Sequence, residues 1–109
     1  MQIFIHDLVG AGPLRDTDAE MQQTASDAAQ LLTGLTGLTF SGVRMFIERT
    51  DGQDAGLIVI EDAHYNGKEF PTGAEMDQLE ADLRSGIESD PGVVSVGSVR
   101  FHCLTNLTT

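Results

Sequence analysis

A seven-residue phrase occurs twice in this chain and limits the folds that it can adopt more than any other feature. Residues 17–23 read TDAEMQQ, and residues 72–78, 55 positions later, read TGAEMDQ. At the same offset and without a gap, residues 3–46 and 58–101 agree at 13 of 44 positions: 3, 5, 7, 12, 17, 19, 20, 21, 23, 27, 37, 42 and 46. Chance would give only a few agreements, so we interpret residues 1–109 as a single domain made of two copies of one unit.

Alternating apolar and polar residues predict four strands, at residues 2–8, 42–49, 57–62 and 93–104. The second and third strands are joined by residues 50–56, which we interpret as a turn around the dipeptide Asp51-Gly52. Residues 64–71 are predicted to form a loop. A bulge at Gly97 would kink the last strand and reverse the face on which its later side chains lie.

Each copy of the repeated phrase is predicted to start a helix. Thr17 and Thr72 are the expected N-caps, and Glu20 and Glu75 complete capping boxes by reaching back to the backbone of the cap. One apolar stripe at helical spacing follows each cap: Met21, Ala25, Ala28, Leu32 and Leu35 in the first helix, and Met76, Leu79, Leu83 and Ile87 in the second. Glycines at 34 and 37 are expected to end the first helix, and residues 90–92 the second.

The resulting order is β-α-β-β-α-β, a duplicated βαβ unit joined by a hairpin. If both crossovers are right-handed, interleaving the two units gives a four-stranded antiparallel sheet of order 4-1-3-2 with both helices on one face. This α+β arrangement is the ferredoxin-like sandwich.

Two helices on one face would leave the other face of the sheet bare, although the strands are apolar on both faces. If the isoleucines of strands one and three face the helices, Phe4 and Val59 face outward, together with Phe46 or Phe101. Such a face is usually a partner surface, and we expect homodimerisation through Phe4, Val59 and Phe46. The alternative is a scattered set of surface apolar residues shielded by loops.

The charge balance favours a basic partner. The chain has 17 acidic residues against 6 basic ones, a formal net charge of −11. Direct binding of nucleic acid is therefore not expected, because phosphate contacts need clustered lysine and arginine. A protein with a basic surface would be attracted, although the same charge could serve only to keep the protein in solution.

The second helix carries much of this charge. Asp77, Glu80, Asp82 and Glu88 flank its apolar stripe, and we expect them to bind the partner. Such a set of carboxylates could imitate the regularly spaced charge of a nucleic-acid backbone and occupy a basic groove on a nucleic-acid-binding protein. Small viral inhibitors of bacterial defence systems use that device, an analogy at the level of charge and size. The sequence thus favours a non-enzymatic interaction module, and a virion or assembly component stays an open alternative.

A second alternative is a small-molecule-binding protein or enzyme of the dimeric α/β-barrel type. Phe4, His6, His64 and His102 would then line or rim a pocket, and His64 could approach His102. No ligand spacing typical of a metal site occurs, so we expect neither a metal nor a cofactor. The histidines show no recognisable catalytic spacing, and we lean against an enzyme.

The remaining signals concern the cellular location. Cys103 is the single cysteine, which excludes an intramolecular disulfide, and we expect it to be a small core residue. The apolar runs are too short for a membrane span, and Met1 leads into a strand pattern without the features of a signal peptide. We therefore expect a cytoplasmic protein with no membrane partner.

Overall fold

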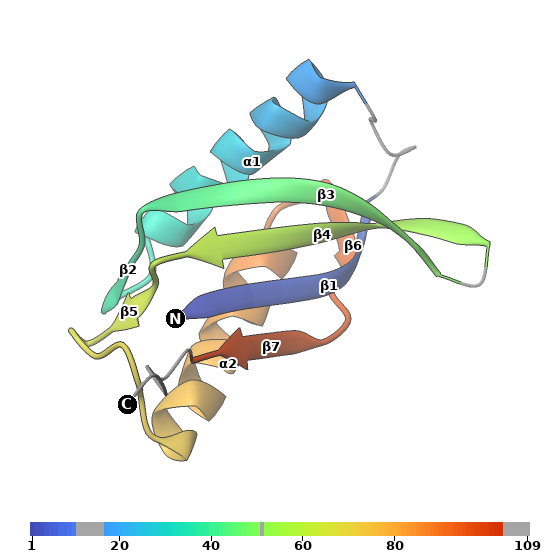
Figure 1. Cartoon of the computed structure of the whole chain (residues 1–109). Helices are drawn as coiled ribbons and strands as arrows, with labels where there is room; N and C mark the ends of the chain where they lie inside the picture. The colour runs from blue at the N-terminus through green and yellow to red at the C-terminus, as the bar shows by residue number, and fades with distance from the viewer. Residues whose placement is uncertain (11–16, 51, 104–109) are drawn as a thin grey trace, which may run out of the picture.

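The computed structural model describes residues 1–10, 17–50 and 52–103, and it belongs to the α+β class, as the sequence predicts (Figure 1). Two helices pack against a mostly antiparallel sheet of five strands, and two further short strands pair with each other. The elements are β1 (Gln2–Gly10), α1 (Asp18–Thr33), β2 (Leu38–Thr39), β3 (Gly42–Thr50), β4 (Gln53–Glu61), β5 (His64–Tyr65), α2 (Gly73–Glu88), β6 (Val93–Ser95) and β7 (Val99–His102).

The sheet has β1 near its centre. Strand β1 pairs on one side with β4, which in turn pairs with β3. On its other side β1 pairs with both β7 and β6, which are two pieces of the last stretch of chain. All these pairings are antiparallel, and β2 pairs with β5 in a separate small sheet. The order across the main sheet is therefore β3, β4, β1 and then β7 with β6.

The core lies between this sheet and the two helices. Ile3, Ile5 and Ile60 are fully buried, and Ile58 is 2% exposed. They share one cluster with residues of both predicted helical stripes: Ala28 and Leu32 of α1, and Leu79, Leu83 and Ile87 of α2. Each of the buried leucines and isoleucines contributes roughly 1.5–3 kcal/mol when it is removed from water. Both helices thus cover the same face of the sheet, and in Figure 1 α2 passes behind β1 and β7.

Both threonines cap their helices as predicted. The backbone N–H of Glu20 donates to the Thr17 hydroxyl at 3.2 Å, and that of Glu75 donates to the Thr72 hydroxyl at 3.3 Å. The capping box is complete at Thr72, whose backbone N–H donates to Glu75 Oε1 at 3.0 Å. At Thr17 the geometry differs, because the Thr17 hydroxyl donates to Glu20 Oε1 at 2.7 Å.

The two copies of the repeat also share a backbone conformation that the sequence analysis did not predict. Asp7 and Asp62, which occupy matching positions, have φ of 55° and 51°. This left-handed region is sparsely populated by residues other than glycine, but aspartate and asparagine enter it more readily than most. The two matching aspartates therefore share a left-handed backbone conformation, Asp7 within β1 and Asp62 directly after the end of β4.

Three predicted segments differ from the structure. Residues 53–56 belong to strand β4, because the β3–β4 pairing continues as far as Thr50 and Gln53; Asp51 lies outside the described residues. Residues 64–65 form β5 instead of a loop, because they pair with β2. The last strand, predicted over 93–104 with a kink at Gly97, is divided at residues 96–98 into β6 and β7, and β7 ends at His102; residue 104 lies outside the described residues. Among the described residues, no helix is long and apolar enough to cross a membrane.

Candidate functional site

The face of the sheet that the helices leave bare has an apolar centre. Phe4 on β1 lies opposite Val59 on β4, and Phe46 on β3 lies opposite Leu57 in the next row. Val59 is 3% exposed although no helix covers it, and Phe46 is 40% exposed. Phe101 lies opposite Ile3 and packs against the core, so Phe46 is the phenylalanine that joins Phe4 on this face.

Charged side chains surround this centre. Arg44 forms an ion pair with Glu61, and its guanidinium carbon lies 5.3 Å from the centroid of the Phe46 ring. That distance is within the range of an attractive contact between a cation and an aromatic ring. The aromatic ring of Phe4 lies between two histidines, stacked on His6 at 6.3 Å and edge-on to His102 at 5.4 Å.

An irregularity in β1 shapes one end of the bare face. The register of β1 against β4 shifts between Ile5 and Leu8, as one extra residue in β1 requires, and Asp7 has its positive φ within this bulge. On the other side of β1 the chain passes close by at Gly97, whose N–H donates to the His6 carbonyl at 3.0 Å. A Cβ atom at Gly97 would lie 2.5 Å from Asp7 Cβ and 2.9 Å from the His6 oxygen, so only glycine fits here.

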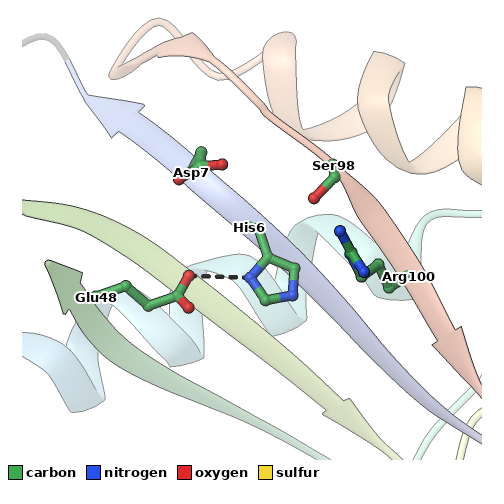
Figure 2. A pocket seen from close by; sticks show the side chains of 5 residues that line it. All are labelled: His6, Asp7, Glu48, Ser98 and Arg100. Carbon is green, nitrogen blue, oxygen red and sulfur yellow. Dashed lines mark hydrogen bonds and ion pairs between the residues drawn. The ribbon is translucent and has the colours of Figure 1, made fainter. Parts of the chain in front are cut away.

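The bulge borders a recess of about 230 Å³ in the bare face (Figure 2). Five residues line it: His6 and Asp7 from β1, Glu48 from β3, Ser98 before β7 and Arg100 from β7. Its volume is below the ~300–1,000 Å³ that is typical of sites for drug-sized ligands, so it would fit a small molecule.

His6 is held in place by Glu48. The distance from His6 Nδ1 to Glu48 Oε1 is 3.0 Å, and both side chains are about one quarter to one third exposed, at 25% and 31%. Because a carboxylate only accepts hydrogen bonds, this contact favours a proton on Nδ1 and leaves Nε2 available to a ligand. The pair thus fixes both the orientation of the ring and the nitrogen that it presents.

The charges in the recess are separated into two sides. In Figure 2, Asp7 and Glu48 lie on one side of His6, and Ser98 and Arg100 lie on the other. Among the described residues, the exposed guanidinium of Arg100 makes no ion pair or hydrogen bond. The recess therefore offers an unpaired cation and a hydroxyl opposite two carboxylates.

The predicted partner-binding residues lie elsewhere, on α2, and the structure gives them two kinds of environment. Glu80 accepts from Arg84 Nε at 3.4 Å, and Asp82 accepts from the Gln78 amide at 2.9 Å. Asp77 and Glu88 are exposed and, within the part of the chain described, have no such partner. The four carboxylates thus belong to the helical side of the molecule, away from the recess.

The sequence predicts that His6, His64 and His102 line or rim a pocket between paired sheets; in the single chain, His6 is the histidine that lines the recess described above. His64 Nδ1 lies 3.2 Å from the Asp62 carbonyl beside the small β2–β5 sheet, whereas His102 contacts Phe4. Cys103 packs against the core, in agreement with its expected role. In the described ranges, no three His, Cys, Asp or Glu side chains are placed to hold a metal ion.

Sequence reasoning missed Asp7, Glu48, Ser98 and Arg100 as neighbours. Strand alternation places Glu48 on the same face as Phe46, so Glu48 could have been found. The positions of Asp7, Ser98 and Arg100 depend on the bulge in β1 and on the interruption of the last strand at residues 96–98, and such departures change which face a side chain occupies. Comparisons with protein-family models, curated proteins and solved structures return no match for the chain.

Proposed function

We propose that the protein is a non-enzymatic acidic interaction module that binds a protein with a basic surface through its helical layer. The observation that carries the proposal is the charge of the two helices, which hold eight carboxylates and one basic residue, Arg84. Arg84 is already engaged, since it contacts Glu80 and donates to the Val96 carbonyl at 3.1 Å. Glu80 is paired with Arg84 and Glu75 with Lys68, but the acidic groups of the helices outnumber the basic groups that pair with them, so the helical layer keeps a net negative charge.

The sharper form of the proposal is mimicry of a nucleic-acid backbone. Asp77, Glu80, Asp82 and Glu88 lie within 12 residues of α2, and at ~1.5 Å per residue they are on average about 5.5 Å apart along the helix axis. The phosphates of one B-DNA strand advance ~3.4 Å per charge along the duplex axis. The carboxylates are spaced more widely than the phosphates, by less than a factor of two, and carry the same sign of charge, so a basic groove that binds a nucleic acid would also attract this helix. A cytoplasmic location remains part of the proposal.

We further propose that the protein is a homodimer through its bare sheet face, with Phe4, Val59 and Phe46 at the interface. A chain with a formal net charge of −11 repels its own copy over most of its surface. The bare face is an exception, because Arg44 is paired with Glu61 and the recess carries charges of both signs. Two copies can therefore meet there with little electrostatic repulsion.

We also assign the fold to the ferredoxin-like arrangement. This assignment counts β6 and β7 as one interrupted strand and leaves out the short strands β2 and β5. The four remaining strands, numbered along the chain, then have the order 4-1-3-2 across the sheet. The interruption at residues 96–98 and the additional small sheet are departures from the simplest form of that arrangement.

A second candidate function is binding of a small molecule, as in proteins of the dimeric α/β-barrel type. The recess at His6 favours it, because the recess combines an oriented imidazole with the guanidinium of Arg100, which has no partner within the described part of the chain. A dimer through the bare face would enclose such a site.

The main proposal is tested by capturing partners with the wild-type protein and with the triple variant Asp77→Asn, Glu80→Gln and Glu88→Gln. The variant removes three charges and keeps the buried stripe of Leu79, Leu83 and Ile87, so it should fold normally. Partners captured only by the wild type should be nucleic-acid-binding proteins that added DNA displaces. Arg100→Gln, on the opposite side of the sheet, is the control and should capture the same partners. Equal capture by the triple variant would refute the proposal.

A further inference from the structure

We infer that the recess lined by His6, Asp7, Glu48, Ser98 and Arg100 binds a small zwitterion, a compound that carries one carboxylate and one ammonium group. This inference rests on the second candidate function and gives it a ligand class. It is independent of the acidic helices, which lie on the other side of the sheet.

The basic side of the recess selects a carboxylate. A guanidinium offers donors in a planar fork that matches the two oxygens of a carboxylate, and the guanidinium of Arg100 has no partner among the described residues. Ser98 adds a hydroxyl on the same side (Figure 2). His6 lies between the two sides and presents Nε2, which accepts a hydrogen bond when Nδ1 carries the single ring proton and donates one when both nitrogens carry a proton.

The acidic side of the recess selects a cation. Asp7 is exposed, and its φ of 55° belongs to the bulge that borders the recess. Glu48 Oε1 contacts His6, which leaves the second carboxylate oxygen of Glu48 available. A ligand with negative charge alone would meet repulsion from these two carboxylates, whereas an ammonium group would be attracted to them.

A zwitterion satisfies both sides at once, and a dianion such as a phosphate monoester does not. The recess volume of about 230 Å³ sets the size of the ligand to that of a small metabolite. The carboxylate of the ligand would lie against Arg100 and Ser98, and its ammonium group against Asp7 and Glu48. His6, between the two sides, would contact the middle of the molecule.

The test is a titration of the full-length protein, followed by NMR of backbone and side-chain signals, with β-alanine and γ-aminobutyrate as zwitterions. Acetate and ethylammonium, which each carry one of the two charges, are the comparison compounds. We expect at least one zwitterion to shift the signals of His6, Ser98 and Arg100. Acetate and ethylammonium should bind at least about tenfold more weakly than the zwitterion, because each lacks one of its two charge-assisted contacts.

Two variants with matched controls assign the contacts. Asp7→Asn removes the charge while asparagine still tolerates the positive φ, and Asp62→Asn makes the same change at the matching position of the repeat, outside the recess. Arg100→Gln is matched by Arg49→Gln, an exposed arginine that pairs with Asp54 on the hairpin. The recess variants should weaken zwitterion binding about tenfold, and the controls should leave it unchanged.

The outcomes separate this inference from the function on which it rests. If acetate binds as tightly as the zwitterions and Asp7→Asn has no effect, the recess binds carboxylates and the zwitterion inference is wrong. If none of the four compounds shifts the recess signals, both the inference and small-molecule binding at this recess are wrong. Neither result bears on the proposal that the acidic helices bind a basic protein, because that proposal is tested separately by partner capture.

Discussion

Replacing Gly97 by alanine should destabilise the protein, because this glycine lies where the last strand passes the bulge of β1. A Cβ atom there would lie 2.5 Å from Asp7 Cβ and 2.9 Å from the carbonyl oxygen of His6. Neither atom is the far end of a flexible side chain, so backbone has to move. Overpacking of this kind costs about 1–3 kcal/mol. A smaller opposing gain of about 0.4–1 kcal/mol comes from the reduced freedom of the unfolded chain.

The net expectation is a loss of about 1–2 kcal/mol in the free energy of unfolding, measured by urea denaturation. At ~4 °C per kcal/mol, the melting temperature should fall by roughly 4–8 °C. The sequence repeat supplies a control, because Gly42 matches Gly97 and a Cβ atom at Gly42 meets nothing within 4 Å. Gly42→Ala should leave stability unchanged or raise it slightly. Equal stability of the two variants would refute the close packing of the last strand against the bulge.

Three further expectations follow from the caps and from the bare face. Thr72→Ala should lower the free energy of unfolding by about 1 kcal/mol, measured by urea denaturation, because it removes the side-chain half of the capping box; an unchanged midpoint would argue against the cap. The hydrogen bond from the backbone N–H of Thr72, followed by that from Lys68 Nζ, lowers the pKa of Glu75 from 4.5 to about 2. The pKa of Glu75 is lower in the folded protein than in the unfolded chain. Glu75 therefore stabilises the fold above pH 4.5, and this contribution is lost as the pH falls toward 2. Glu75→Gln should therefore be less stable than the wild type at neutral pH and approach it in acid, and a constant difference across that range would contradict the assignment. Phe4→Lys should convert a dimer into monomers in sedimentation experiments, and a monomeric wild type would remove the proposed interface.

The sequence predicted the helices well because their signals are local. A threonine cap, an acid three residues later and an apolar stripe are all contained within one helix, and the structure has them at Thr17 and Thr72. The buried isoleucines of β1 and β4 were also predictable, because alternation along a strand assigns them to one face. The duplication strengthened both predictions, since the same pattern appears twice.

The recess could not be predicted, because it depends on where two strands depart from regular pairing. The extra residue in β1 places Asp7 at the border of the recess, and the interruption near Gly97 decides that Phe101 faces the core while Arg100 faces outward. Neither departure leaves a signal in the alternation of residue types. Two residues gave hints: Gly97, where the sequence suggested a bulge, and Asp7, which matches Asp62 in the repeat and shares its positive φ.

The measurement that tests the central claim most directly is the salt dependence of binding between the protein and a partner captured through its helical layer. If the carboxylates of α2 make the contact, wild-type affinity should fall steadily as salt is added, because the screening length is ~8 Å at physiological ionic strength. The variant carrying Asp77→Asn, Glu80→Gln and Glu88→Gln should bind weakly at low salt and show a smaller dependence on salt. Arg100→Gln should follow the wild-type curve. Wild-type affinity that does not change with salt, or that Arg100→Gln abolishes while the triple variant retains it, would contradict the account.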